Sequence, residues 1–303
     1  MSFIDEIKKA FKKSDMLMKL IYINLVVFII VNIVLVFSFL LQVQGGTFSI
    51  VRWFAVPSDF MSLIYKIWTP ITYMFLHEDF WHILGNMLWL FFLGRIFITY
   101  LGEKKLLSIY LLGGLAGALL YVLSFNLFPA FSGAVRSSVA LGASASVTAV
   151  VLSIALYKPD FMIRPFGLFQ IPLRFVALFF IIYDMVSIRG GNAGGHIAHL
   201  GGAIVGIVFV IRYKSGADIT KGFEQFLEKF FALFQPKSRM RVTQRKKKQT
   251  RPTAPKNETD KAYNARKNSE QQEVDRILDK IKLSGYDSLS KAEKEILFRQ
   301  GKK

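Results

Sequence analysis

Long apolar segments dominate the first two thirds of the chain. Residues 20–41 carry no charged side chain, and a helix of this length crosses roughly 30 Å of hydrocarbon. Further apolar segments occupy residues 80–102, 106–127, 139–157, 171–188 and 196–211. Because these segments are apolar on all sides rather than along one stripe, the pattern predicts helices buried in lipid and against one another. We expect an all-α, polytopic membrane protein.

Two of the segments are weaker than the others. The fifth carries Arg174 and Asp184 near its ends, where both side chains could snorkel to the membrane interface. The sixth is short and rich in glycine, so hydropathy alone leaves five or six spans. The first segment is too long for a signal peptide, and no small-residue cleavage site follows it before Gln42. We expect it to be retained.

The basic residues decide between five spans and six. The formal net charge is +18, and Lys and Arg crowd the first twenty residues and residues 237–267. Basic flanks face the cytoplasm, so both ends of the bundle should lie on that side and the number of spans must be even. Lys104 with Lys105, and Lys158 with Arg164, follow the second and fourth spans and agree with this direction. We predict six spans with both termini in the cytoplasm.

The chain after the sixth span divides into three parts. In residues 218–234 the large apolar side chains share one face, which predicts a helix lying in the interface; burial as a soluble helix is the alternative. Residues 237–267 are polar and basic, which is typical of a disordered linker. Ser290 and Glu293 form a capping box that opens the second helix of a short C-terminal module.

These patterns predict an ordered set of divisions. They are a basic cytoplasmic arm (residues 1–19), a six-span bundle (20–213), an interfacial helix (214–235), a disordered basic linker (236–271) and a small helical module (272–303). A basic tail beside a membrane domain attracts anionic lipid. Nucleic acid is the disfavoured alternative, since a tail without a fold cannot read bases. The chain has no cysteine, which excludes disulfides and thiolate chemistry without determining the compartment.

Polar residues at membrane depth are costly and therefore mark candidate chemistry. They form three sets, each in the first part of an even-numbered span: His77, His82 and Asn86; Ser144; and His196 and His199. Spans two, four and six run in the same direction, so the three sets should meet at one depth near the extracytoplasmic leaflet. His82 and Asn86 are four residues apart and share a helical face. The arrangement suits one nucleophile, one base and several hydrogen-bond donors.

Each of these residues also has a structural interpretation. A membrane serine commonly bonds to its own helix, and an asparagine often joins two helices. The histidines invite a metal site. However, the only carboxylates expected in their layer are Glu78 and Asp79 at the loop edge, and no H-E-x-x-H pattern is present. We therefore predict neither a metal nor a cofactor.

At these residues the chain resembles the rhomboid family of intramembrane serine proteases. The run from His77 to Asn86 looks like the pattern H-x-x-x-x-H-x-x-x-N, and Gly142 to Ser144 resembles G-x-S-G without its last glycine. Ala198 to Gly206 matches A-H-x-x-G-x-x-x-G. The resemblance covers about residues 15–213, and the tail module is similar to one behind rhomboids of Bacteroidetes-type bacteria. It implies a rhomboid-like bundle in a bacterial inner membrane.

The resemblance also implies roles for the polar residues. Ser144 would be the nucleophile and His199 the general base and acid, as a dyad without a carboxylate. Asn86, His82 and the backbone N–H of Ser144 would form the oxyanion hole. Four residues would support the motifs: His77, Gly142, Gly202 and Gly206. The two glycines in the sixth span would let it pack closely on the fourth. Substrates would be transmembrane proteins.

Three departures from the family pattern stand out. Ala145 replaces the usual glycine, and its methyl group could crowd the backbone turn or the oxyanion hole. Thr148 stands where an aromatic residue often stacks on the histidine, and Arg52-Trp53 reverses the usual pair of the first outer loop. A catalytically inactive relative that binds membrane helices is the main alternative function. A transporter is the third, disfavoured because no inverted repeat is visible.

Overall fold

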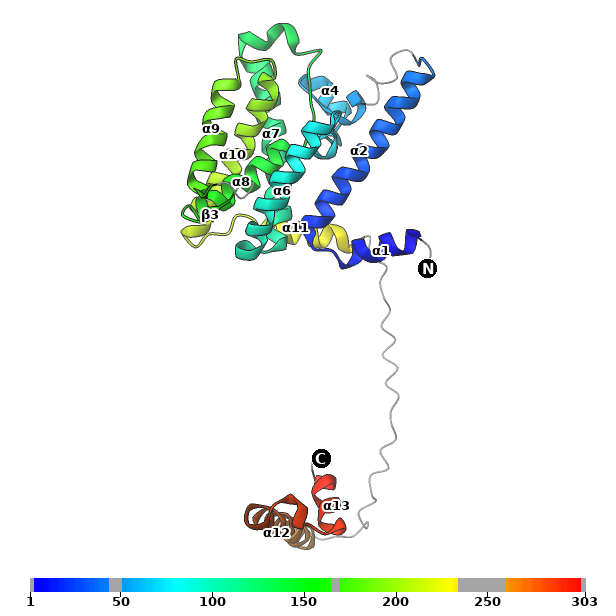
Figure 1. Cartoon of the computed structure of the whole chain (residues 1–303), viewed down its shortest axis with the longest axis vertical. Helices are drawn as coiled ribbons and strands as arrows, with labels where there is room; N and C mark the ends of the chain where they lie inside the picture. Colours follow the sequence, from blue (N-terminus) through cyan, green and yellow to red (C-terminus); the bar gives the residue numbers. More distant parts are fainter. Residues whose placement is uncertain (1–2, 44–50, 165–168, 234–259, 301–303) are drawn as a thin grey trace. The chain divides into compact units, whose positions relative to one another are not determined.

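The chain forms two compact units, Met1–Gln235 and Pro236–Lys303 (Figure 1). The computed structural model describes residues 3–43, 51–164, 169–233 and 260–300. Within the first unit, six helices occupy the segments predicted as spans: α2 (Met16–Leu40), α6 (Phe80–Leu101), α7 (Glu103–Leu127), α8 (Ser144–Tyr157), α9 (Leu173–Ser187) and α10 (Ala193–Lys214). The prediction of an all-α, polytopic membrane bundle is confirmed.

The six helices differ in length. Among the described residues, α2, α6, α7 and α10 are long and apolar enough to cross a membrane. The helix α8 is apolar but has only 14 residues, and α9 has 15. At 1.5 Å per residue, α8 is about 21 Å long, which is shorter than the roughly 30 Å of hydrocarbon in a bilayer. The chain is a multi-pass membrane protein.

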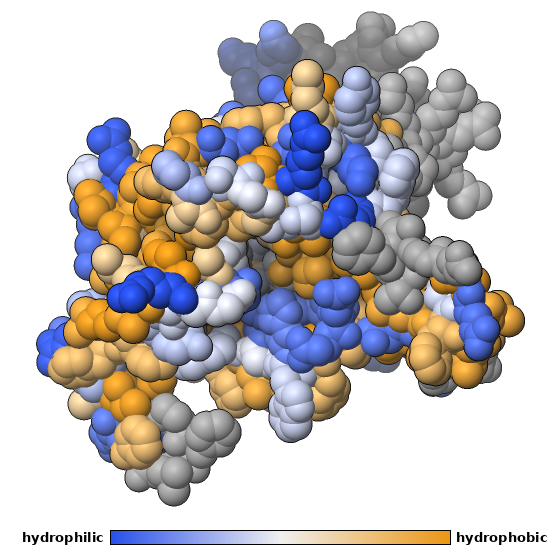
Figure 2. All heavy atoms as spheres, turned by 90° about the horizontal axis from the view of Figure 1, so that it is seen from above, coloured by the Kyte–Doolittle hydropathy of each residue, from blue (hydrophilic) through white to orange (hydrophobic). Residues whose placement is uncertain are grey.

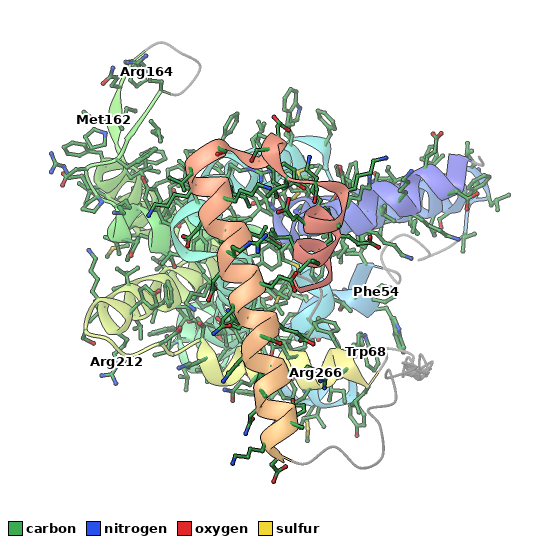
Figure 3. All side chains as sticks on the ribbon, turned by 90° about the horizontal axis from the view of Figure 1, so that it is seen from below. Phe54, Trp68, Met162, Arg164, Arg212 and Arg266 are labelled. Carbon is green, nitrogen blue, oxygen red and sulfur yellow. The ribbon has the colours of Figure 1, made fainter. Side chains whose placement is uncertain are left out.

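Short elements precede, connect and follow the long helices. They are α1 (Phe3–Lys13), α4 (Phe60–Tyr65), α5 (Thr69–Thr72), η1 (Tyr73–Phe75), η2 (Pro129–Ala134) and α11 (Lys221–Ala232). Two antiparallel strand pairs join β1 (Val56–Pro57) to β2 (Val139–Ala140) and β3 (Met162–Ile163) to β4 (Ile171–Pro172). The register of the first pair places Val56 opposite Ala140. Met162 and Arg164 lie on the β3–β4 hairpin, which projects from the edge of the unit (Figure 3).

Glycines of α10 let this helix approach the backbone of α8 closely. A Cβ built on Gly202 would lie 2.0 Å from the carbonyl oxygen of Ala145, and one on Gly206 would lie 2.7 Å from that of Ala149. Both distances are shorter than real Cβ contacts, so only glycine allows the two backbones to approach this closely. The residue numbers of the contacts rise in the same direction along both helices, and α8 therefore runs parallel to α10.

A neighbouring face of α8 packs on α7 through a second glycine pair. A Cβ on Gly117 would lie 2.6 Å from the Cβ of Ala145, and one on Gly113 would lie 2.3 Å from that of Ala149. Here the numbers run in opposite directions, so α7 is antiparallel to α8. The two alanines are thus held between glycines of two neighbouring helices.

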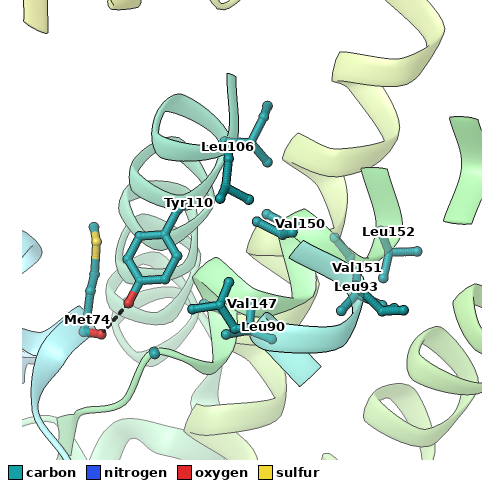
Figure 4. Close-up of a cluster of buried hydrophobic side chains, with 14 of the residues drawn as sticks. Met74, Leu90, Leu93, Leu106, Tyr110, Val147, Val150, Val151 and Leu152 are labelled. Atoms are coloured by element: carbon teal, nitrogen blue, oxygen red, sulfur yellow. Dashed lines mark hydrogen bonds between the residues drawn. The ribbon is translucent and has the colours of Figure 1, made fainter. Parts of the chain in front are cut away.

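The remaining core is apolar with a few hydrogen bonds between elements. Val147, Val150 and Val151 of α8 pack with Leu90 and Leu93 of α6 (Figure 4). The Tyr110 hydroxyl of α7 donates to the carbonyl of Met74 at 3.0 Å, and Asn24 of α2 donates to that hydroxyl at 3.2 Å. Because buried polar groups need partners, these bonds attach α2 and η1 to α7.

Helix α11 joins the bundle through charged residues. Lys105, near the start of α7, pairs with Asp218 at 2.8 Å and with Glu224 at 3.5 Å. Phe226, Phe230 and Phe231 of α11 are exposed. An apolar face left open beside a membrane bundle agrees with a helix in the interface.

The second unit consists of α12 (Asp260–Ser284), η4 (Tyr286–Ser288) and α13 (Lys291–Gln300). The predicted capping box is confirmed: the Ser290 N–H donates to the Glu293 carboxylate at 2.7 Å, and the Glu293 N–H donates to Ser290 Oγ at 3.3 Å. The Ser290 N–H and then the ammonium of Lys280 lower the pKa of Glu293 to about 2. Ile277 and Leu289 are buried between the helices.

One predicted boundary in the tail is wrong. Residues 236–271 were expected to form a disordered linker, but α12 begins at Asp260. The segment from this residue onward contains no Gly or Pro up to Ser284, and Arg266 pairs with Glu270 one turn later at 3.6 Å. Such local features favour a helix even where apolar periodicity is weak. The rest of the predicted linker, 236–259, lies outside the described residues.

The glycine contact between α8 and α10 can be tested by substitution. Gly202→Ala should lower the unfolding free energy by about 1–3 kcal/mol, because the new Cβ overlaps the Ala145 carbonyl. Thermal unfolding of the detergent-solubilised protein measures the loss. Gly222→Ala in α11, where a Cβ would meet nothing within 4 Å, is the matched control and should be neutral or stabilising. Equal melting temperatures for the two variants would contradict the close contact.

Candidate active site

The structure brings residues from five of the long helices, α6 to α10, around one cavity of about 980 Å³. Its polar lining includes His82, Asn86, Ser144, Asp184, His196 and His199. The three sets of polar residues expected at one depth therefore meet in space, although more than a hundred residues separate the first from the last. Seen from the upper end of Figure 1, hydrophilic residues gather near the middle of the molecule, with hydrophobic residues on either side (Figure 2).

Ser144 is the first residue of α8, directly after a constrained turn. Gly142 has φ +119°, and its N–H donates to the carbonyl of Tyr73 at 2.9 Å. The first bond within the helix runs from the Val147 N–H to the carbonyl of Ala143 at 2.9 Å. The N–H of Ser144 precedes it and has no acceptor within the helix, and the positive end of the helix dipole lies here. This position suits an oxygen that gains negative charge.

His77 lies behind the cavity wall and organises it. It is fully buried, and its Nε2 accepts from the Asn86 amide at 3.1 Å and from the Ala143 N–H at 3.3 Å. A backbone N–H can only donate, so Nε2 carries no proton and the neutral ring is protonated on Nδ1. One ring thus holds both the amide of Asn86 and the turn before Ser144. This contact gives the motif residue His77 a physical role.

His82 depends on the glycine at position 142. Asp79 caps α6 and accepts from the His82 N–H at 2.9 Å, which places this ring at the cavity end of the helix. A Cβ on Gly142 would lie 2.7 Å from His82 Cε1 and 2.9 Å from its Nε2. Glycine is therefore required twice, for the positive φ and for the space that the imidazole occupies.

Asp184 is the residue that sequence reasoning missed. Its Oδ1 lies 2.8 Å from Nδ1 of His199 and 2.9 Å from Nδ1 of His196, and the side chain is buried. The expectation that this carboxylate snorkels to the interface is wrong, as is the expectation that no carboxylate shares the layer of the histidines. The available signal was a lone Asp within the apolar run of α9, which in a membrane helix normally faces a functional partner.

The nucleophile and base candidates face the same cavity without a hydrogen bond between them. Among the described residues, Ser144 Oγ has no side-chain hydrogen bond. In unliganded enzymes such contacts are often long and shorten when substrate binds.

Comparison with known proteins agrees with the motifs and the bundle. The rhomboid domain model matches residues 65–215, and a family of unknown function (DUF6576) matches residues 257–303. RHOMBOID-like protein 12, mitochondrial, of Arabidopsis thaliana is 32% identical over 160 residues, which cover 50% of this chain and 48% of that protein. The chain thus spans about half the length of this relative. It belongs to the rhomboid family.

In this rhomboid, the alanine after the candidate nucleophile has a structural partner. Ala145 is 1% exposed, and its methyl group lies against Gly117 of α7. Space that a larger residue at 117 would fill is thereby taken by the methyl group. From the sequence, this methyl group was expected to crowd the backbone turn or the oxyanion hole. The structure offers another role for it, which is to pack α8 against α7.

Substitution of this alanine distinguishes the two interpretations. Ala145→Gly should lower the unfolding free energy by about 1 kcal/mol, through loss of a buried methyl group, while turnover stays unchanged. Ala149→Gly, which removes the matching methyl one turn further along α8, is the control and should cost a similar amount. Thermal unfolding and steady-state kinetics on a transmembrane reporter give both quantities. A rise in turnover specific to Ala145→Gly would show that the methyl group narrows the oxyanion hole.

Proposed function

We propose that this rhomboid is an intramembrane serine endopeptidase that hydrolyses peptide bonds in or near transmembrane segments. The supporting observation is the position of Ser144, at the N-terminus of α8 and on the same cavity as His199 of α10. A nucleophile and an imidazole at membrane depth, with donors beside them, form the minimal set for acyl transfer.

The proposed reaction has two halves. Nε2 of His199 takes the proton of Ser144 Oγ as this oxygen attacks the scissile carbonyl carbon, and the imidazolium then protonates the departing amine. The acyl ester on Ser144 is hydrolysed by water, which His199 deprotonates in the same way. The cavity of about 980 Å³ has ample volume for water molecules. These steps use side chains and water, with neither metal nor cofactor.

The negative oxygen of the tetrahedral intermediate needs donors. We assign this role to the backbone N–H of Ser144, the Asn86 amide and His82. One N–H of the Asn86 amide donates to His77, which fixes the orientation of the amide and leaves its second N–H for the cavity side of α6. Removal of one oxyanion donor typically lowers turnover by a factor of about 10² to 10³.

The surroundings of the cavity suit an apolar substrate. Trp89 of α6 and Phe180 of α9 line the cavity. Their rings meet edge to face, with centroids 5.0 Å apart. Side chains rather than backbone hydrogen bonds close this wall, so rotamer changes can open it toward lipid. A transmembrane segment is the substrate that such an opening admits.

The charge distribution supports an orientation. We propose a bacterial inner membrane with both termini in the cytoplasm, since the arm before α2 and the segment after α10 are basic. The tail would hold anionic lipid there and bind no nucleic acid. The cavity lies near the opposite face of the bilayer in this orientation.

The proposed nucleophile and base make the first functional prediction. Ser144→Ala and His199→Ala should each abolish cleavage of a transmembrane reporter and labelling by a fluorophosphonate probe, with normal expression and melting temperature. Ser153→Ala, which alters a buried serine bonded to its own helix at 2.7 Å, is the matched control and should retain both. A folded wild-type protein that neither labels nor cleaves would instead indicate a rhomboid that binds membrane helices without cutting them.

The C-terminal unit should be dispensable for chemistry. All proposed reactive groups lie within residues 77–199, inside the unit Met1–Gln235. Truncation after Gln235 should therefore leave kcat and KM on a detergent-solubilised reporter within about twofold of the full chain. A truncated protein that remains folded by thermal unfolding yet loses all peptidase activity would make the tail part of the catalytic machinery.

A further inference from the structure

Asp184 lies outside the roles assigned so far, and its contacts are specific. One carboxylate oxygen faces Nδ1 of His199 at 2.8 Å and Nδ1 of His196 at 2.9 Å. The side chain is 2% exposed, on α9, while both histidines lie on α10. A buried carboxylate is costly without donors, and these two rings supply them.

The distances decide between hydrogen bonds and a metal site. The three ligand atoms lie within 4.8 Å of one another and could in principle surround a cation. Ligands at about 2.0–2.1 Å from a tetrahedral zinc are separated by about 3.3 Å. The observed 2.8 and 2.9 Å separations are those of N–H···O bonds to a charged acceptor. Hydrogen bonding is therefore the better description.

The hydrogen bond determines which nitrogen of His199 is basic. When the Asp184 carboxylate is ionised it can only accept, and Nδ1 of His199 then carries the proton. The lone pair then resides on Nε2, the nitrogen that must deprotonate Ser144. When His199 takes that proton, the carboxylate faces the resulting imidazolium and stabilises it without itself becoming protonated.

We propose that Asp184 is a positioning residue that extends the Ser144–His199 pair to a triad, with His196 holding the carboxylate in place. This inference rests on the proposed peptidase function and adds a carboxylate to it. Asp184 does not touch the substrate; it fixes the tautomer and orientation of the base. His196 is the second donor to the buried carboxylate oxygen.

The first arm of the test is kinetic. Asp184→Asn should lower kcat on a transmembrane reporter by about 10²-fold, because the amide can donate or accept and no longer dictates the tautomer, while KM changes by less than about twofold. Asp160→Asn, which removes an exposed carboxylate paired with Arg174 of α9 at 2.8 Å, is the matched control and should retain full activity. His196→Gln should lose less than Asp184→Asn. Wild-type kcat in folded Asp184→Asn would overturn the proposal.

The second arm reads the tautomer directly and does not need activity. The chain has 4 histidines, so ¹⁵N spectra of histidine-labelled protein can be assigned by single substitutions. His199 should carry its proton on Nδ1 in the wild type and populate the Nε2–H form in Asp184→Asn. His77, held by the Ala143 N–H, should remain protonated on Nδ1 in both proteins and serves as the internal control.

The outcomes separate the two proposals. A wild type without fluorophosphonate labelling refutes the peptidase while the tautomer of His199 still reports on Asp184. If Asp184→Asn fails to fold, the wild-type spectrum decides alone: a proton on Nε2 of His199 overturns the positioning role. Stoichiometric zinc in the purified wild type that Asp184→Asn loses would also overturn it, in favour of a metal site.

Discussion

The close approach of three helices is the constraint on which the rest of the structure depends. Ala145 and Ala149 of α8 lie against glycines of both α7 and α10, and α7 and α10 also meet through Gly117 and Gly201. Without side chains in the way, backbone packs against backbone, and dispersion contacts accumulate where lipid supplies no hydrophobic driving force. Because α8 and α10 run parallel with a fixed register, the N-terminus of one and the first turns of the other arrive at the same depth.

Much of this arrangement follows from simple patterns. Apolar length and basic flanks predict the helices, because the bilayer imposes both requirements on any chain that crosses it. The glycine at position 202, four residues before that at 206, predicts close packing. Direction along the chain, read from charge, predicts that His82, Ser144 and His199 share a layer. All three line one cavity in the structure.

The sequence did not predict the contacts of Asp184, because they depend on the rotation of α9 about its own axis rather than on the depth of the residue in the membrane. Asp184 lies near the end of α9, where an ionisable side chain can reach either water or a partner, and one sequence does not say which way the helix faces. The packing of α9 against α10 decides it by aiming this carboxylate at two imidazoles. The start of α12 escaped prediction for a different reason, because its helix rests on local propensity and surface charges rather than on an apolar stripe.

The turn before Ser144 is also tied to a distant part of the chain. Gly142 donates its N–H to Tyr73, whose hydroxyl donates to the carbonyl of Gly114 in α7, while the next carbonyl, of Met74, accepts from Tyr110. The turn before Ser144 is therefore hydrogen-bonded to η1, and η1 is hydrogen-bonded to α7 through Tyr73 and Met74. Local opening of the turn at Gly142 would have to break these hydrogen bonds as well. Its amide protons should therefore exchange with solvent only through a larger, cooperative fluctuation of the bundle.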